Sequence, residues 1–307
     1  MRPKSRSFTT SDFLLAVETI PHLIYYNSMK KIFAAAIFAF FAACAFCAEN
    51  EKDFDAFVRD AFKIKLEAKL KTTSQESLDW IAAERQKLLD SANGKVGGEA
   101  TLALECLFAV EQFHYMREID AKSSASKDFL MEQYNKVDAW NQGHPAESRS
   151  EWYNLASYEV VNTAMPYIKY SKKVAYAMEE KKVYGAMADS NCQKGLLYLD
   201  AGLWRAFAPA IAGGNEAKAL EYFEKATKIG PSDYEKFFGF VYLSQMDFKR
   251  GDLNSCLARL DQADALLPGN VYIPFVRRLN KAGSDIFEYA NDKEKAMAKI
   301  KKNGGSN

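Results

Sequence analysis

A 37-residue internal repeat in the C-terminal half is the feature that most constrains how this 307-residue chain can fold. The repeat runs from a glycine followed by Asn or Asp, through small and large apolar positions, to a closing proline. The matched pairs are Gly214-Asn215 with Gly251-Asp252, Ala219 with Cys256, Phe223 with Leu260, Ala226 with Ala263, and Pro231 with Pro268. A period of about 20 to 50 residues is typical of proteins whose units stack on their neighbours to bury a shared core.

The residues within each unit predict two packed helices. Small residues recur at helical spacing along 219–226, with Phe223 between them. Small side chains let two helix backbones approach closely, and a large apolar side chain fills the space beside them. We therefore assign helix packing and helix termination to nine residues: Ala219, Phe223, Ala226, Pro231, Leu243, Ser244, Leu260, Ala263 and Pro268.

This pattern resembles the tetratricopeptide repeat family. The run 219–226 followed by Pro231 is similar to the second helix of such a repeat, and Leu243 and Ser244 are similar to the first helix of the next. The resemblance is strong over residues 195–270. The period of 37 exceeds the family's usual 34 or so, which places about three extra residues after Pro231. The resemblance implies an all-α fold, a solenoid of helical hairpins with an N-terminal helical region.

The region before the repeats is also predicted to be helical. No proline occurs between residues 49 and 144, and apolar residues from Phe54 to Phe62 recur every three or four positions. Thr73 and Glu76 have the spacing of a capping box, which predicts a helix start. Two further helices are expected over 99–119 and 127–140, with the serine-rich segment 123–126 as the turn between them.

A secretory signal peptide is predicted from Met29 to Ala48. Two lysines precede an unbroken apolar run that ends at small residues and then acidic ones. Met29 is therefore interpreted as the true start, and residues 1–28 as a non-native extension. The sequence around Cys44 resembles a lipoprotein-processing motif, which makes Cys44 a candidate for lipidation. The alternatives to lipidation are cleavage by ordinary signal peptidase and retention as a membrane anchor. Cleavage would place the protein in the periplasm, and lipidation would tether it to the membrane.

The predicted organisation of the chain has five parts. These are an N-terminal extension (1–28), a signal peptide (29–48), an N-terminal helical region (49–147), tetratricopeptide-like repeats (148–283), and a C-terminal helix and tail (284–307).

Composition and motifs argue against several classes of function. The formal charge of +1 provides no strong positive field for nucleic acid, so no nucleic-acid partner is expected. Glu111 and His114 have the spacing of a di-iron ligand pair, but the sequence holds no second copy of that motif. Ser124 and Lys127 have the spacing of an S-x-x-K motif, but its companion motifs are missing, and neither G-x-S-x-G nor a phosphate-binding loop occurs. We therefore expect no catalytic residues, metal or cofactor, and predict that the protein is not an enzyme.

The family resemblance also implies a binding surface. In tetratricopeptide repeats the first helix of each hairpin lines a concave face that receives a partner. Carried onto this sequence, those positions are Phe238, Val241, Tyr242, Gln245, Lys249 and Trp204. Aromatic residues with polar neighbours suit a peptide or a small apolar ligand. Packing of Phe238 and Trp204 against neighbouring repeats is the alternative.

Two functions follow from these expectations. The first is a non-catalytic scaffold of the bacterial cell envelope that binds another protein or a peptide segment. The second rests on a proline, a glycine pair and the run 218–226, which look similar to the repeat proteins associated with TRAP-type solute transporters. In that case the helical array would hold a small ligand. Contact with a membrane is expected only through a lipid anchor.

Overall fold

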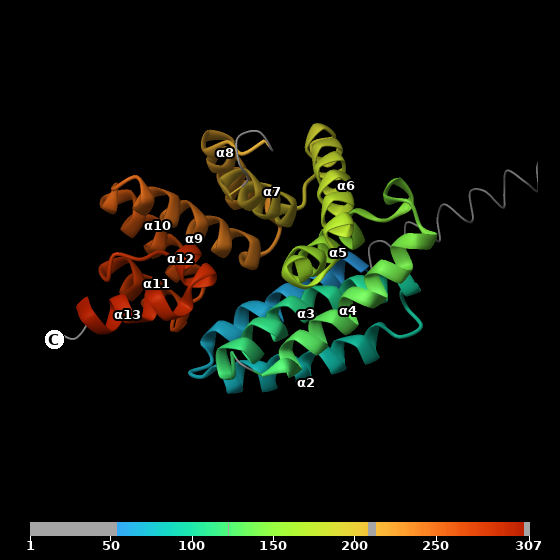
Figure 1. Cartoon of the computed structure of the whole chain (residues 1–307), viewed down its shortest axis with the longest axis horizontal. Helices are drawn as coiled ribbons and strands as arrows, with labels where there is room; N and C mark the ends of the chain where they lie inside the picture. Colours follow the sequence, from blue (N-terminus) through green and yellow to red (C-terminus); the bar gives the residue numbers. More distant parts are fainter. Residues whose placement is uncertain (1–53, 122, 208–212, 304–307) are drawn as a thin grey trace, which may run out of the picture. The chain divides into compact units, whose positions relative to one another are not determined.

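The computed structural model describes residues 54–121, 123–207 and 213–303 (Figure 1). These residues form helices joined by short connections, and no strand occurs among them, so the all-α prediction is confirmed. The predicted signal peptide, Cys44 and Pro209 lie outside the described residues. None of the described helices combines the length and the apolarity that crossing a membrane requires.

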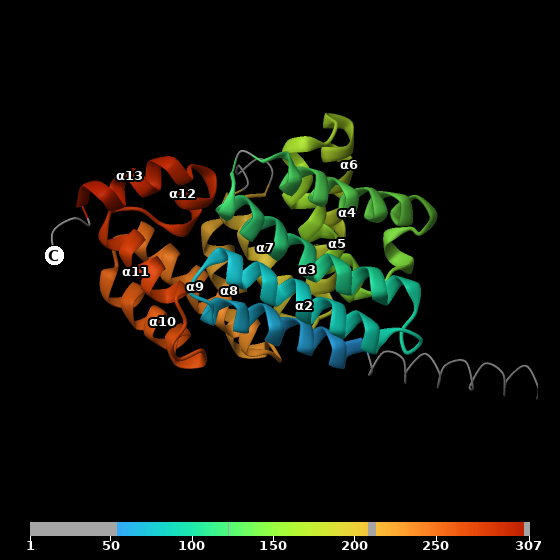
Figure 2. The ribbon, with the colours of Figure 1, turned by 90° about the horizontal axis from the view of Figure 1, so that it is seen from below.

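The N-terminal helices pack around α3. Residues 54–67 are helical and lead into the short helix η1. The elements that follow are η1 (Ala68–Leu70), α2 (Ser74–Ala92), α3 (Gly98–Ile119), α4 (Ser124–Gly143), η2 (Ala146–Ser148) and α5 (Glu151–Ala164). Helix α3 contacts α2, α4 and α5, and ten of its residues are buried, which makes it the centre of this region (Figure 2).

Helix starts in this region follow the local sequence, with one correction. The capping box at Thr73 and Glu76 is present, and α2 begins directly after it. The segment 123–126 was predicted to be a turn, and this is wrong for three of its four residues. The Ser123 side chain accepts a hydrogen bond from the backbone of Ala125, so α4 begins at Ser124. Serine is disfavoured inside helices but favoured at their N-caps, which explains why the serine run starts a helix.

The remaining helices follow in chain order. They are η3 (Met165–Tyr167), α6 (Tyr170–Asp189), α7 (Gly195–Phe207), α8 (Glu216–Ile229), α9 (Asp233–Lys249), α10 (Leu253–Leu266), α11 (Tyr272–Lys281), α12 (Ile286–Asn291) and α13 (Lys293–Asn303). Helix α7 packs against α8, α8 against α9, and α9 against α10, so helices adjacent in sequence are neighbours in space (Figure 1).

The 37-residue offset corresponds to equivalent structural positions. Asn215 and Asp252 are the N-caps of α8 and α10, and each side chain accepts a hydrogen bond from a backbone N–H three residues on. Of the nine residues assigned to packing and termination, seven are completely buried: Ala219, Phe223, Ala226, Leu243, Ser244, Leu260 and Ala263. Pro231 and Pro268 are exposed just beyond the ends of α8 and α10.

A glycine sets the close approach of α7 and α8. A Cβ atom added at Gly202 would lie 2.4 Å from Cε1 of Phe223, a distance that real Cβ contacts do not reach. Gly239 lies 37 residues after Gly202 and is packed equally tightly, against Thr227 of α8. The repeat therefore includes a glycine position in its first helix, where side chains of the neighbouring helix leave no room for a Cβ atom.

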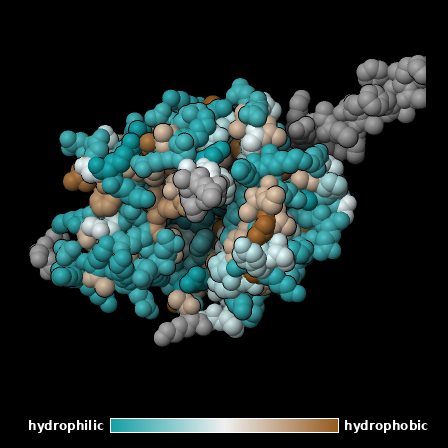
Figure 3. Space-filling model, turned by 45° about the horizontal axis from the view of Figure 1, so that its top comes forward, coloured by the Kyte–Doolittle hydropathy of each residue, from teal (hydrophilic) through white to brown (hydrophobic). Residues whose placement is uncertain are grey.

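Contacts far apart in sequence join the N-terminal helices to α9 and α11. The rings of Phe62 and Tyr234 stack with centroids 4.9 Å apart, and the backbone N–H of Val271 donates to the carbonyl of Lys69 at 2.9 Å. Figure 3 shows a mostly hydrophilic surface on the face that it presents, with apolar side chains in separate small patches. Aromatic rings such as those of Phe62 and Tyr234 therefore contribute to packing between helices.

Candidate ligand-binding pocket

The predicted concave surface of α9 is largely covered in this structure. Val241 and Gln245 are fully buried, and Phe238 is 8% exposed. Gln245 is held by α11 and α12: its amide exchanges hydrogen bonds with Asn280, and its oxygen also accepts from the backbone N–H of Ile286. These hydrogen bonds connect α9 with α11 and α12, so the Gln245 amide is used inside the protein.

The other predicted surface residues separate into different environments. The Phe238 ring contacts the rings of Tyr234, Tyr242 and Tyr272, so it packs as the alternative interpretation expected. Lys249 is exposed, and its Nζ lies 5.6 Å from the centroid of the Phe207 ring. The structure therefore does not bring the six predicted residues together as one open surface.

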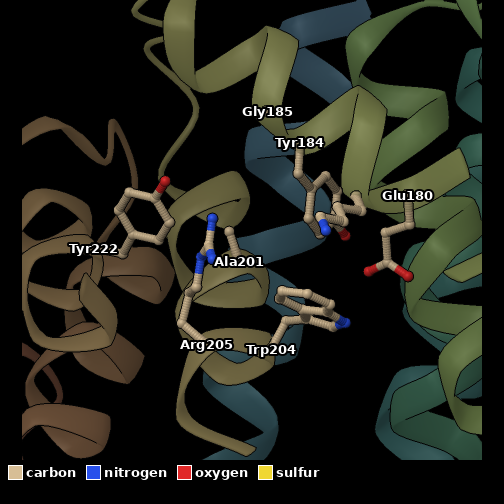
Figure 4. Close-up of a pocket in the computed structure, with 8 residues that line it drawn as sticks. Glu180, Tyr184, Gly185, Ala201, Trp204, Arg205 and Tyr222 are labelled. Atoms are coloured by element: carbon tan, nitrogen blue, oxygen red, sulfur yellow. The ribbon is translucent and has the colours of Figure 1, made fainter. Parts of the chain in front are cut away.

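Trp204, in contrast, lines a pocket between α6, α7 and α8 (Figure 4). The cavity volume is about 40 Å³, which corresponds to about three water molecules. Its lining residues are Glu180, Lys181, Tyr184 and Gly185 of α6, Ala201, Trp204 and Arg205 of α7, and Tyr222 of α8. Three aromatic side chains, one carboxyl group and two cationic side chains therefore border one small space, which combines apolar area with groups that can orient a bound molecule.

A turn after α7 holds Trp204 and Arg205 in position. Arg205 donates from Nη1 to the carbonyl of Gly213 at 2.6 Å, and its guanidinium lies 5.5 Å from the Trp204 ring. Gly213 has a positive φ of 98°, and a Cβ there would lie 3.0 Å from Trp204. Glycine suits this position, because it adopts a positive φ readily and leaves room for the Trp204 ring.

Glu180 is a buried acid on the pocket wall. The residue is 3% exposed, and its Oε1 accepts a hydrogen bond from Nδ2 of Asn162 at 2.8 Å. Burial raises the pKa of Glu180 to about 7, because removal from water disfavours the charged form, and hydrogen bonds from Asn162 and Tyr184 oppose this only in part. The carboxyl group is therefore balanced between its neutral and charged forms near neutral pH.

Asp200 lies behind Tyr184. The Tyr184 hydroxyl donates to Oδ2 of Asp200 at 3.3 Å, which connects the pocket wall to this second acid. The pKa of Asp200 is raised well above its ordinary value, first by burial and then by the charges of Glu159 and Glu180. Two acids on neighbouring helices therefore resist ionisation together.

Two further charged side chains, those of Lys65 and Glu159, lie in the interior. The Lys65 side chain is 2% exposed, and its Nζ lies 3.8 Å from Oε2 of Glu159 and 4.7 Å from the centroid of the Tyr234 ring. That separation is too long for a hydrogen bond. Within the described chain, Oε2 of Glu159 is buried without a hydrogen-bond partner. Burial raises the pKa of Glu159, and the charge of Lys65 acts in the opposite direction.

Glu111, which has the spacing of a metal ligand relative to His114, forms an ion pair with Lys69. Lys69 forms a short hydrogen bond with Glu111 and another with the Tyr115 hydroxyl at 2.9 Å. Glu111 is thus used by Lys69, while His114 is exposed beside Phe113. No group of His, Cys, Asp and Glu residues in the part of the chain that the structure describes could hold a metal ion. Among the described residues, Cys106, Cys192 and Cys256 are buried free thiols.

The sequence patterns indicated Trp204 but not Glu180, Tyr184 or Asp200. Asp200 did carry a signal, because it is the only acidic residue in the apolar helix α7. Glu180 carried none, since it lies in a helix rich in lysine and glutamate. Comparison of the chain with protein-family models, curated proteins and solved structures found no match.

Proposed function

We propose that this chain is a non-catalytic, tetratricopeptide-like binding protein that holds a small ligand in the pocket between α6, α7 and α8. The observation that carries the proposal is the juxtaposition of a buried carboxyl group, Glu180, with the aromatic side chains of Tyr184, Trp204 and Tyr222 around one space. Aromatic walls supply apolar contact area, and a single polar group orients the bound molecule.

The placement of the α9 residues favours this function over peptide binding on the concave face. A peptide there would need Val241 and Gln245, which are fully buried, and would have to displace the hydrogen bonds between Gln245 and Asn280. Breaking buried hydrogen bonds costs about 1–3 kcal/mol for each group left unpaired. None of these hydrogen bonds involves a residue that lines the pocket.

We place this activity in the bacterial cell envelope, after export through the signal peptide at residues 29–48. Lipidation of Cys44 remains the proposed means of membrane attachment. The described body would then act as a solute-holding subunit, as the resemblance to transporter-associated repeat proteins implies.

A pocket-filling variant tests the proposal. Gly185 lines the pocket, and a Cβ added there meets no atom within 4 Å, so the Cβ of Gly185→Phe lies in open space at the pocket and its ring is expected to block it. Gly143→Phe is the matched control, because Gly143 is also exposed near a helix end with open space around it. Native mass spectrometry of the protein purified from its own cells should show a bound small molecule in the wild type and the control, and loss of it in Gly185→Phe.

The same measurement separates the two functions. Wild-type protein that carries no small molecule but retains a stoichiometric protein partner, with the partner still present in Gly185→Phe, would contradict ligand binding and favour the scaffold.

A further inference from the structure

Helix α6 carries apolar side chains on its solvent side as well as on its packed side. Tyr176 and Tyr184 are buried against the rest of the protein. Tyr170, Val174 and Met178 follow one another at intervals of four residues and are 80%, 41% and 69% exposed. Residues four apart lie on the same face of a helix, so these three side chains form one exposed apolar stripe along α6.

Tyr167 extends the stripe beyond the start of α6. It lies in η3, three residues before Tyr170, and it is exposed. The Nζ atom of Lys127, near the start of α4, lies 5.6 Å from the centroid of its ring. Figure 1 shows α6 at the edge of the described helices, beside α5 and α7. A contiguous exposed apolar patch of this kind marks a site of contact with another body.

Lysines border the stripe. Five lie in α6 or directly before it: Lys169, Lys172, Lys173, Lys181 and Lys182. Two of them pair with acids of α4 and η2. Lys169, Lys173 and Lys181 form no ion pair with any residue that the structure describes. Their positive charge is therefore free to meet an anionic partner.

The acids of α6 lie away from the stripe. Glu180 is buried, and Glu179 is half-buried in an ion pair with Arg149. Asp189 is exposed, but it is the last residue of α6 and lies about three turns beyond Met178. Between residues 170 and 182, α6 therefore presents apolar side chains and positive charge together, with no exposed acid of its own.

A second exposed apolar pair, on α10, has the opposite surroundings. Leu253 and Leu257 are 56% and 49% exposed and are also four residues apart. Their charged neighbours are acids, because Asp252 precedes Leu253 and Asp261 follows Leu257 by four residues, and both are exposed. Apolar exposure alone does not distinguish α6 from α10, whereas the unpaired lysines do.

The size and charge of the stripe favour a membrane over a protein as its partner. A stable protein interface takes about 20–30 residues from each side, many more than the four apolar side chains here. A helix that lies on a bilayer is held by a few inserted side chains and by attraction of lysines to anionic headgroups. Tyrosine is enriched at the level of the headgroups, and a lysine stem can lie along apolar surface while its ammonium group stays in water.

We propose that the exposed face of α6 rests on a membrane surface that contains anionic phospholipid. Tyr167, Tyr170, Val174 and Met178 enter the headgroup region, and the lysines of α6 lie at the lipid phosphates. The helix lies along the membrane, because its other face is packed in the protein. This contact is additional to the lipid anchor proposed at Cys44, and it does not depend on that anchor or on a ligand in the pocket.

Brominated lipid tests which side chains reach the membrane, because bromine quenches the fluorescence of a tryptophan that it contacts. Met178→Trp places a tryptophan in the stripe, and Leu257→Trp is the matched control in the exposed pair of α10. Each full-chain variant is mixed with vesicles of phosphatidylglycerol and dibrominated phosphatidylcholine, and the signal of the four native tryptophans is subtracted. The added tryptophan should lose most of its fluorescence at position 178 and almost none at position 257. The readout is local, so attachment of vesicles through residues 29–48 does not imitate it.

Lysine substitutions test the role of charge. In the Met178→Trp background, Lys173→Gln combined with Lys181→Gln should raise the lipid concentration for half-maximal quenching more than tenfold, since each lysine near an anionic surface contributes about fivefold in affinity. Lys301→Gln combined with Lys302→Gln, two exposed lysines of α13, is the control and should change it less than about twofold. Vesicles of phosphatidylcholine alone should quench much less, and high salt should weaken the quenching on anionic vesicles.

Three results would overturn the membrane contact. These are equal quenching at positions 178 and 257, no quenching at position 178 on anionic vesicles, and quenching there that the lysine substitutions leave unchanged. A concentration-dependent dimer in sedimentation velocity without lipid, lost in Met178→Ser, would assign the stripe to a second copy of the chain instead. If circular dichroism shows that Met178→Trp does not fold, Val174→Trp provides the same readout one turn earlier.

Discussion

Replacement of Glu180 by Gln should change the pH dependence of stability in a defined direction. Gln has nearly the same shape, and its oxygen can still accept the hydrogen bond from Asn162. It cannot ionise. The difference in unfolding free energy between wild type and Glu180→Gln therefore isolates the titration of one buried carboxyl group.

The magnitude follows from the pKa. Burial raises the pKa of Glu180 from 4.5 to about 7, so between these values the folded protein keeps a proton that the unfolded chain has released. Stability of the wild type must then fall as pH rises, by about 1.4 kcal/mol per pH unit. The loss relative to Glu180→Gln should reach about 3 kcal/mol at pH 7 and stay constant above it. Below pH 4.5 the group is protonated in both states, and the two curves should run parallel.

Urea unfolding followed by far-UV circular dichroism at half-unit steps from pH 4 to pH 8.5 measures this difference. The slope of free energy against urea concentration should be the same for both proteins, because the surface exposed on unfolding is unchanged. A difference between the two proteins that varies by less than about 0.5 kcal/mol over this range would refute the claim that Glu180 is buried and uncompensated.

Three further substitutions test the packing. Gly202→Ala should destabilise the protein by about 1–3 kcal/mol in urea unfolding, because its Cβ would overlap Phe223, and an unchanged midpoint would contradict the close approach of α7 and α8. Gln245→Ala should cost about 1–3 kcal/mol, because it leaves the N–H of Ile286 unpaired and removes both hydrogen bonds between Gln245 and Asn280, so wild-type stability would count against this network. Thr73→Ala should cost about 1 kcal/mol through loss of the capping box, and a change below about 0.3 kcal/mol would show that the cap is not formed in solution.

The local parts of the fold were predictable from the sequence. The capping box at Thr73 and Glu76 and the equivalent caps at Asn215 and Asp252 are set by hydrogen bonds within four residues. The alternation of small and large residues from Ala219 onward likewise reports the packing of adjacent helices. The serine run at 123–126 was misread, because serine is common both in turns and at helix starts.

The pocket could not be predicted in the same way. Lys65 and Asp200 are far apart in sequence and become neighbours only when the N-terminal helices pack against α7 and α9. Burial raises the pKa of Glu180, and the residues near it in sequence do not indicate that burial. The repeat pattern also indicated a first-helix surface in α9 but did not reveal that α11 and α12 hold Gln245.

Fluorine NMR of protein labelled with 5-fluorotryptophan tests the central claim most directly. The chain has four tryptophans, and the Trp204 resonance can be assigned by its loss in Trp204→Phe. Addition of the small molecule that co-purifies with the wild type to ligand-free protein should shift the Trp204 resonance saturably and leave those of Trp80, Trp140 and Trp152 in place, and Gly185→Phe should abolish the shift. An unmoved Trp204 resonance at concentrations of that molecule that saturate the protein calorimetrically would contradict binding in this pocket.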